Sequence, residues 1–300
     1  MKRSAHFLIL AALLCLSVLG CRAEEKRFDR TFSVTPGGKL MVDTDVGSVS
    51  VEGGAGNEVV VKAVLRGSER EVREFTVSAE QRENIVEVQG RWSSDARGWR
   101  NRRLEVSFII RVPREFNVNV ETAGGSVKLK SLTGTVTGET SGGSIKAEDI
   151  SGPLLCETSG GSITAERITG NATLETSGGR VIVKEVVGDV DAESSGGGLS
   201  LTDIEGKVRA ETSGGSISIE MKGEHRGVYA STSGGSINIT VPGDVRATLD
   251  ASTSGGSVSC DLPLTTQGRI DPSSLRGTIN GGGNPIHAST SGGSVRIRAR

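Results

Sequence analysis

Six glutamates recur at a constant spacing in the middle of the chain, and carboxylates in such a row could bind cations. Each follows the previous one by 18 residues, and they are Glu121, Glu139, Glu157, Glu175, Glu193 and Glu211. On adjacent strands, neighbouring carboxylates would lie about 4.8 Å apart and repel by roughly 1 kcal/mol per pair in a water-like dielectric. A divalent cation or a basic partner would relieve this repulsion, and the alternative is a solvated face whose side chains splay apart.

A second candidate site brings arginines together with the only tryptophans of the chain, between residues 91 and 103. Tryptophan and arginine are enriched at the centres of protein interfaces, so this segment is predicted to be a hairpin tip that binds a partner. The alternative is a solvated loop whose tryptophans fold back on the sheet. The candidate partner-binding residues are Trp92, Trp99, Arg97, Arg100, Arg102 and Arg103.

Residue types that catalyse reactions do not cluster in this sequence. His225 and His287 lie in different repeats without obvious partners, and both are predicted to be surface residues. We find no nucleophile motif, no phosphate-binding loop and no cysteine–histidine zinc spacing. The net charge of −1 gives no electrostatic case for nucleic-acid binding. The sequence therefore predicts no catalytic residues, no cofactor and no metal site.

The candidate glutamates belong to a repeat that must position them. The segment Thr140-Ser141-Gly142-Gly143-Ser144-Ile145 has copies, 18 residues apart, that begin at Thr122, Thr158, Thr176, Ser194 and Thr212. Later copies begin at Thr232, Thr253 and Thr290, after steps of 20, 21 and 37 residues. A fixed step of this size is typical of a solenoid, in which each coil buries its apolar face against its neighbours.

Apolar residues follow the same step, for example in the column Ile145, Ile163, Val181, Leu199 and Ile217. Such columns predict strands that pair with their equivalents one coil away, with at least two β-faces per coil. Paired glycines, as at Gly142 and Gly143, suit turns that need a positive φ. Parallel crossovers are right-handed by default. The predicted fold class is all-β: a right-handed parallel β-helix (β-solenoid) with 18-residue coils over residues 120–300.

Residues 31–119 lack this step and are predicted to form an antiparallel-rich β region that caps the first coil, because an open end would be an unpaired edge. Thr44–Val51 resembles a diverged copy of the repeat, which makes the boundary soft. Near the other end, residues 275–283 are predicted to resume the coil. Arginine then alternates with apolar residues over 294–300, as expected of a last, exposed strand protected against aggregation. The candidate strands of the cap are 39–51, 58–65, 75–79, 85–92 and 104–112.

Residues 1–20 have the features of a lipoprotein signal peptide, with a basic start and an apolar stretch too short to span a membrane. The sequence Val18-Leu19-Gly20-Cys21 resembles a bacterial lipobox, which would make Cys21 the lipidated first residue. Ordinary secretion with nearby cleavage is the alternative. Residues 21–30 are a predicted tether, and the residue after Cys21 favours the outer membrane if the cell is Gram-negative. Cys156 and Cys260 are predicted to be buried free thiols too far apart for a disulfide.

The repeats resemble the bacterial "putative adhesin" family of β-strand-repeat proteins, a domain of unknown function. The entry segment Val112-Pro113 … Phe116-Asn117-Val118-Asn119-Val120-Glu121-Thr122 and the segment Gly277–Gly283 carry the resemblance further, which covers roughly residues 31–300. It implies a right-handed β-helix on the cell envelope and supplies no catalytic residues. Some relatives are linked to envelope-stress systems.

These features predict a non-catalytic, lipid-anchored protein of the cell envelope that presents a repetitive β-solenoid surface for binding or adhesion. Its expected partners are the membrane, through the N-terminal lipid, and an envelope protein or glycan. An envelope-stress signalling accessory is an alternative, and a carbohydrate-active β-helix enzyme is another, since fold alone does not establish function.

Overall fold

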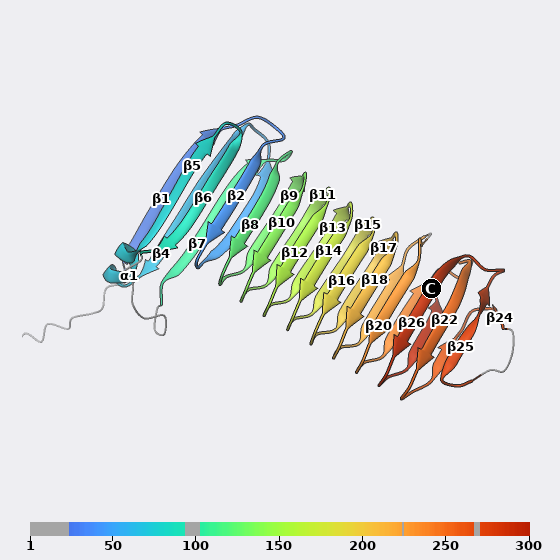
Figure 1. The fold of residues 1–300 in the computed structure, drawn as a ribbon. Coiled ribbons are helices and arrows are strands. Elements are labelled where there is room, and N and C mark those ends of the chain that lie inside the picture. The colour runs from blue at the N-terminus through green and yellow to red at the C-terminus, as the bar shows by residue number, and fades with distance from the viewer. Residues whose placement is uncertain (1–23, 94–102, 224, 267–270) are drawn as a thin grey trace, which may run out of the picture.

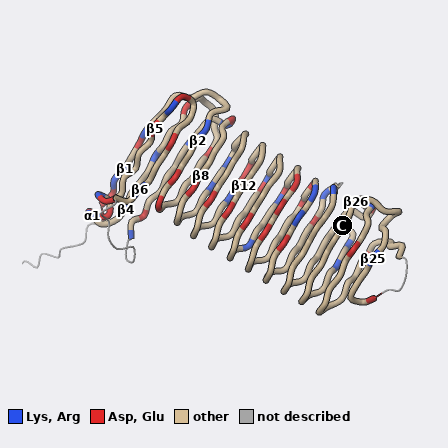
Figure 2. The backbone as a smooth tube through the Cα atoms, viewed as in Figure 1, with Lys and Arg blue, Asp and Glu red and all other residues tan. Residues whose placement is uncertain are grey.

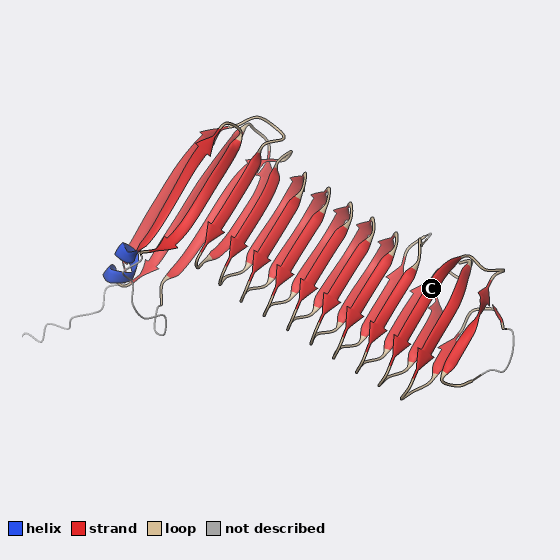
Figure 3. Cartoon of the chain, viewed as in Figure 1, coloured by secondary structure: helices blue, strands red, loops and turns tan. Residues whose placement is uncertain are grey.

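The computed structural model describes residues 24–93, 103–223, 225–266 and 271–300. In these residues two long β-sheets run along an elongated stack, and one short helix, α1 (Glu69–Glu74), lies at the end where the described chain begins (Figure 1, Figure 3). Apolar side chains of the two sheets meet between them and form one continuous core.

The first sheet contains, in spatial order, β1 (Glu24–Ser33), β4 (Glu58–Gly67), β7 (Glu105–Pro113), β3 (Ser48–Gly54), β9 (Val127–Thr133), β11 (Ile145–Ser151), β13 (Ile163–Thr169), β15 (Val181–Val187), β17 (Leu199–Glu205), β19 (Ile217–Met221), β21 (Ile237–Val241), β27 (Val295–Ala299) and β23 (Val258–Cys260). The second sheet contains β24 (Leu264–Thr265), β25 (Ser274–Ile279), β22 (Ala247–Thr253), β26 (Asn284–Thr290), β20 (Val228–Thr232), β18 (Val208–Thr212), β16 (Val190–Ser194), β14 (Ala172–Thr176), β12 (Leu154–Thr158), β10 (Val136–Thr140), β8 (Asn117–Thr122), β2 (Lys39–Thr44), β6 (Ile85–Trp92) and β5 (Phe75–Arg82).

Each central coil gives one strand to each sheet, and equivalent residues of successive coils lie opposite one another. Ile145 of β11 is opposite Ile163 of β13, and Leu154 of β12 is opposite Ala172 of β14. These four side chains are at most 2% exposed. The predicted all-β architecture with stacked, mostly parallel strands is confirmed, because identical inward positions pack coil on coil.

A left-handed residue interrupts each long strand of the central coils. Asp149 and Arg167 both have φ of 57°. The pairing of β11 with β13 passes from Glu148–Glu166 directly to Ile150–Ile168. The extra residue turns the chain so that Ala147 and Ile150 both point into the core, three residues apart. The other residues at this position are Ser131, Glu185 and Asp203, with φ of 55° to 57°.

The repeated Thr-Ser-Gly-Gly segment fastens each turn to the turn before it. The buried Thr158 hydroxyl donates to the carbonyl of Gly143 at 2.8 Å and accepts from the Gly161 amide at 3.3 Å. A Cβ on Gly161 would overlap the carbonyl oxygen of Gly143. The second glycine of each pair is therefore needed for close approach of the coils, and the predicted positive φ is wrong for both glycines. Positive φ is found instead in the other glycine column, at Gly134, Gly152, Gly170, Gly188 and Gly206.

At the N-terminal end, the coil of β2 and β3 already belongs to the stack. Thr44 lies opposite Thr122, and β3 pairs in parallel with β9. The region over 58–113 is an insertion whose antiparallel pairs, β4–β7 and β5–β6, extend both sheets. The predicted tether is wrong from Glu24 onward, because β1 pairs with β4 along its whole length. Helix α1, which begins with the capping box of Ser68 and Glu71, was not anticipated.

At the C-terminal end, the coil that comes last in the chain does not come last in space. Strand β26 lies between β20 and β22, and β27 lies between β21 and β23. The prediction of a last, exposed strand over 294–300 is therefore wrong. Residues 275–283 do not resume the coil either, because β25 runs antiparallel to β22. We call residues 284–300 the inserted coil.

Both remaining cysteines are free thiols. Cys156 is fully buried, as predicted, and burial raises the pKa of its thiol to about 12. Cys260 is only partly buried, so the prediction of two buried thiols is wrong for this residue. It lies in β23, the edge strand of the first sheet, which covers less of its side chain than an interior strand would.

Candidate functional site: an acidic groove on the second sheet

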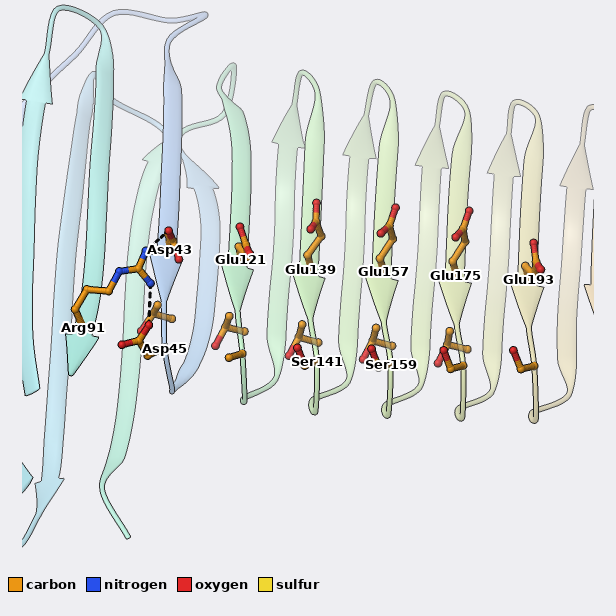
Figure 4. A pocket seen from close by; sticks show the side chains of 18 residues that line it. Asp43, Asp45, Arg91, Glu121, Glu139, Ser141, Glu157, Ser159, Glu175 and Glu193 are labelled. Carbon is orange, nitrogen blue, oxygen red and sulfur yellow. Dashed lines mark hydrogen bonds and ion pairs between the residues drawn. The ribbon is translucent and has the colours of Figure 1, made fainter. Parts of the chain in front are cut away.

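The six glutamates of the sequence pattern lie in register on six adjacent strands of the second sheet, from β8 to β18. Glu121 is opposite Glu139, and the pairing continues coil by coil to Glu211. Asp43 of β2 lies opposite Glu121 and extends the row (Figure 4). Because these residues alternate with buried ones, the carboxylates stand on the outer face of the sheet.

The part of this row from Asp43 to Glu193 lines an open groove of about 550 Å³. Four serine hydroxyls at the strand ends line it as well, and Figure 4 shows Ser141 and Ser159 beneath the carboxylates of their strands. These hydroxyl-bearing residues are Ser141, Ser159, Ser177 and Ser195. From β10 to β16 the groove thus repeats one carboxylate and one serine hydroxyl per coil. Figure 2 shows acidic residues recurring from strand to strand. We call this surface the acidic groove.

Arginines of the protein neutralise both ends of the acidic row. At the β2 end, Arg91 pairs with Asp43 and, at 3.0 Å, with Asp45, whose other oxygen accepts from the Trp92 amide at 2.9 Å. At the β18 end, Arg209 pairs with Asp191 at 3.1 Å and Glu211 at 2.8 Å. A guanidinium can therefore bind two carboxylates of this surface at once.

The carboxylates between these ends form no ion pair with any described residue; they are Glu121, Glu139, Glu157, Glu175 and Glu193. Burial, and then the charges of Glu157 and Glu121, raise the pKa of Glu139. Burial, and then Glu157, Glu193 and Asp191, raise the pKa of Glu175, against a smaller opposite effect of Arg209. Both shifts have the direction expected when like charges crowd a half-solvated surface.

Two outward carboxylates in the middle of the first sheet, Glu148 and Glu166, are paired with cations. Glu148 of β11 lies within 3.3 Å of Lys146 and 2.6 Å of Arg167, and the pKa of Glu148 is lowered, first by the hydrogen bond from Lys146. Lys146 also lies 3.8 Å from Glu166 on the next strand. Glu148 and Glu166 of the first sheet are therefore paired with cations, whereas the carboxylates from Glu121 to Glu193 in the acidic groove are not.

The carboxylates of the groove run parallel and do not converge on a point. Within the described ranges, no group of three His, Cys, Asp or Glu side chains is arranged to hold a metal ion. A row of this geometry can accept several separate positive charges in succession, so it suits an elongated cationic ligand better than a single chelated ion.

The structure describes only part of the Arg–Trp segment. Trp92 is partly buried and packs edge-on against Phe75, with ring centroids 5.1 Å apart. This tryptophan folds back on the sheet, which was the alternative interpretation. The Arg103 amide donates to Glu71 at 2.7 Å. Arg97, Trp99, Arg100 and Arg102 lie outside the described residues, as does the predicted lipidation site Cys21.

The two histidines of the sequence analysis have opposite environments. His287 is about half exposed, and its Nδ1 lies 3.9 Å from Asp250. His225 is only 3% exposed, so the prediction of a surface residue is wrong for it. The sequence signal that could have shown this is the two-residue lengthening of its repeat, which encloses the residue in a loop. No helix within the described part of the chain is long and apolar enough to cross a membrane.

Comparisons with known proteins found similar solved structures and a matching family. Solved structures that resemble the chain include a putative adhesin from Bacteroides fragilis, with 14% identity over 92% of this chain and 97% of that one and a TM-score of 0.39. A putative lipid binding protein from Parabacteroides distasonis shares 13% identity over 91% and 96% of the two chains, with a TM-score of 0.43. No curated protein matches the sequence.

The family description Toastrack DUF4097 matches residues 37–298. Because this range includes nearly the whole described stack, the chain belongs to the Toastrack DUF4097 family. The predicted relationship to adhesin-like β-strand-repeat proteins is confirmed.

Proposed function

We propose that this protein is a non-catalytic, lipid-anchored protein of the bacterial cell envelope that binds a basic, extended segment of another envelope protein in the acidic groove. The observation that carries the proposal is the run of in-register carboxylates, from Glu121 to Glu193, that no described cation neutralises. The family and the adhesin-like structural neighbours support a surface protein without enzymatic activity.

Binding would follow from relief of repulsion along a rigid row. A lysine or arginine placed between two adjacent carboxylates replaces a repulsive pair with two attractive ones. Arg209 shows that one guanidinium on this sheet can pair with two carboxylates at once, Asp191 and Glu211. Because the strands hold the carboxylates in place, little ordering is needed on this side of the interface. The interaction is between partly solvated charges, so it weakens as salt increases.

Lipid on Cys21 would attach the chain a few residues before β1 begins at Glu24 and would leave the stack free to present the groove. We also propose that the coils wind with a right hand and a repeat of 18 residues, since right-handed crossovers are the rule for parallel strands.

The groove is tested with a fluorescent ten-residue lysine peptide and the protein expressed from Glu24, read by anisotropy. We expect the triple variant Glu139→Gln/Glu157→Gln/Glu175→Gln to bind the peptide about tenfold more weakly, because roughly 0.5 kcal/mol is lost for each partly exposed pair. The matched control is Glu148→Gln/Glu166→Gln/Glu185→Gln on the first sheet, which changes the net charge equally. Equal weakening in both variants would show that overall charge, and not the groove, attracts the peptide.

Calcium tests the alternative that the acidic groove binds divalent cations instead of a basic segment. If the carboxylates bind divalent ions in preference to a basic partner, millimolar calcium raises the melting temperature of the protein and displaces the peptide. We expect neither effect beyond that of sodium chloride at equal ionic strength, because the carboxylates do not converge.

The anchor has its own test in cells. Replacing Cys21 by serine is expected to move the protein from the membrane fraction to the soluble fraction and to abolish incorporation of labelled fatty acid. Retention of Cys21→Ser in the membrane fraction, with normal export, would refute lipidation at this residue.

A further inference from the structure

Two arginines lie next to each other on the outer face of β27, the strand that the inserted coil gives to the first sheet. Arg296 and Arg298 are exposed, and they alternate with Val295 and Ile297, which are buried in the core. Residues two apart on a strand point to the same face, with Cα atoms about 7 Å apart. The backbone of a single strand therefore fixes the separation of the two positive charges.

Protection of a sheet edge does not explain these charges. Charged side chains on an edge strand hinder its pairing with other chains. Strand β27, however, pairs in parallel with β21 on one side and with β23 on the other. An interior strand has few free backbone groups to protect. The exposure of Arg296 and Arg298 therefore needs another explanation.

The side chains that lie beside the two arginines are neutral and can form hydrogen bonds. Arg296 is opposite Asn238 of β21 and Ser259 of β23, and Arg298 is opposite Thr240 of β21. These three neighbours are partly exposed, so their amide and hydroxyl groups are accessible from the outer face. Such groups both donate and accept hydrogen bonds, as the hydroxyl groups of a sugar do.

The carboxylates near this strand leave the two arginines unpaired. Arg300 pairs with Asp203 at 3.0 Å and with Glu220 at 3.2 Å. Asp261, which follows β23, comes beside Arg298 in the register without forming an ion pair with it. Neither Arg296 nor Arg298 forms an ion pair with any residue that the structure describes. Their two charges are therefore available to an anion from outside the molecule.

The surroundings of the two arginines favour a sugar over a protein segment as the ligand. Protein interfaces are enriched in aromatic side chains and have an apolar core. Among the described residues, the exposed large hydrophobic side chains lie outside β19, β21, β23 and β27; they are Ile85, Ile109, Val187 and Tyr229. A surface of guanidinium, hydroxyl and amide groups matches a ligand that is rich in hydroxyl groups and also carries acidic groups.

The position of β27 in the stack disfavours a lipid surface as the ligand. In the strand order of the first sheet, β27 lies 11 places from β1, which corresponds to about 50 Å at the usual strand spacing. The proposed lipid anchor would join the chain just before β1, at the opposite end of the stack (Figure 1). This step alone rests on the proposed function, and the preceding steps do not depend on it.

We propose that Arg296 and Arg298 form a binding site for an acidic polysaccharide. Its carboxylate or phosphate groups pair with the two guanidinium groups, which can donate two parallel hydrogen bonds to such an anion. Its hydroxyl groups bond to Asn238, Thr240 and Ser259. The site lies on the first sheet and the acidic groove on the second, so a cationic and an anionic ligand do not compete for the same residues.

Binding of a fluorescein-labelled decamer of galacturonic acid to the protein expressed from Glu24, read by anisotropy at low salt, tests the site. We expect Arg296→Gln/Arg298→Gln to bind the decamer about tenfold more weakly, because two partly exposed ion pairs are lost. The matched control, Lys128→Gln/Lys184→Gln, removes two exposed lysines from the same sheet and should leave binding nearly unchanged. Asp261→Asn should tighten binding, because it removes a competing carboxylate beside Arg298.

Several results would overturn the proposal: no binding of the decamer by the wild type, equal weakening in the lysine control, or equal binding of a neutral maltodextrin decamer. Tighter binding of a glutamic acid decamer, or of phosphatidylglycerol vesicles, through the same arginines would overturn the choice of a polysaccharide. If the arginine variant does not fold, unchanged affinity in Asp261→Asn would refute the site. These measurements involve neither the lipid anchor nor the acidic groove, so failure here would leave the proposed function standing.

Discussion

The smallest repeating unit of this molecule is one hydroxyl and one glycine in each coil. The hydroxyl of Thr158 satisfies a carbonyl of the preceding coil and an amide of its own turn. The second glycine of each pair lets the two turns approach until their backbones touch. These two residues account for the repeated motif through contacts between neighbouring coils, without any requirement from a ligand.

The two glycines of a pair should therefore respond very differently to a methyl group. Gly161→Ala forces the Cβ into the backbone of Gly143 and is expected to lower the free energy of unfolding by about 3 kcal/mol or more. A Cβ on Gly160 would have its nearest neighbour, the carbonyl oxygen of Ser141, at 3.5 Å, which is an ordinary van der Waals contact. Gly160→Ala should therefore change stability by less than about 1 kcal/mol. Chemical denaturation of both variants compares them. Similar losses would contradict the account of close approach.

The repeat predicts where the paired glycines lie but not why they are glycines, because a sequence pattern carries no dihedral angles. Glycine is equally suited to positive φ and to close backbone contact, and only the coordinates separate the two uses. The left-handed φ of Arg167 and Glu185 was invisible for the same reason, since neither residue type favours that conformation. The burial of the threonine column, by contrast, follows directly from the step of the repeat.

At the scale of strands, the acidic groove results from a repeat in register. Because the step is constant, every strand from β8 to β18 brings its glutamate to the same height, and the row could be predicted from the spacing alone. The arginine at one end could not, because Arg91 reaches Asp43 and Asp45 across 46 to 48 residues of sequence and through an insertion. The absence of ion pairs along the row from Glu121 to Glu193 could not be predicted either, because the sequence does not show which lysines and arginines lie near which carboxylates.

Removal of one carboxylate from the middle of the row should stabilise the fold. Glu139→Gln removes repulsion from two neighbours and is expected to raise the free energy of unfolding at pH 7 by about 0.5–1 kcal/mol at low salt. Since the folded pKa of Glu139 is raised, its unfavourable contribution is absent well below pH 4.5 and grows as the pH rises through and above that value. Thermal melts of wild type and variant at pH 3.5 and pH 7 should show the gain only at pH 7.

High salt tests whether repulsion between carboxylates causes this gain in stability. At 1 M sodium chloride the Debye length is about 3 Å, and the advantage of Glu139→Gln should largely vanish. Glu148→Gln serves as the matched variant on the first sheet. It should be destabilising or neutral, because it removes an acceptor from Lys146 and Arg167. A gain in both variants would contradict the contrast between the sheets.

At the scale of the whole molecule, the order of coils in space departs from their order in the chain. The 37-residue gap before Thr290 was visible in the sequence, but its path was not, because a parallel neighbour and an inserted neighbour have the same strand pattern. The alternation of arginine with apolar residues in β27 suits an outer face equally well on an edge strand and on an interior one. Only the strands that pair with β27 show whether it is an edge strand or an interior strand, and the sequence pattern does not identify those strands.

Deletion of residues 284–300 should open the stack at one place only. Strand β22 loses its parallel neighbour, so its amides are expected to lose protection from hydrogen exchange. Strands β12 to β16 should remain protected, because each coil contacts only the coils beside it.

The double variant Arg296→Ala/Arg298→Ala keeps the inserted backbone and provides the control. It should change stability by less than about 1 kcal/mol and should not aggregate, as expected for an interior strand. Aggregation of this variant would indicate that β27 lies at an open edge after all.

The insertion also has a consequence for assembly between molecules. Until residues 284–300 arrive, β20 and β21 on one side and β22 and β23 on the other border a vacant slot with unpaired strand edges. The slot is shaped for one particular coil, but it cannot distinguish the coil of its own chain from that of a second copy. Refolding at high concentration should therefore yield exchanged dimers in which each chain completes the other. The feature that seals the monomer is also the one through which two copies could become entwined.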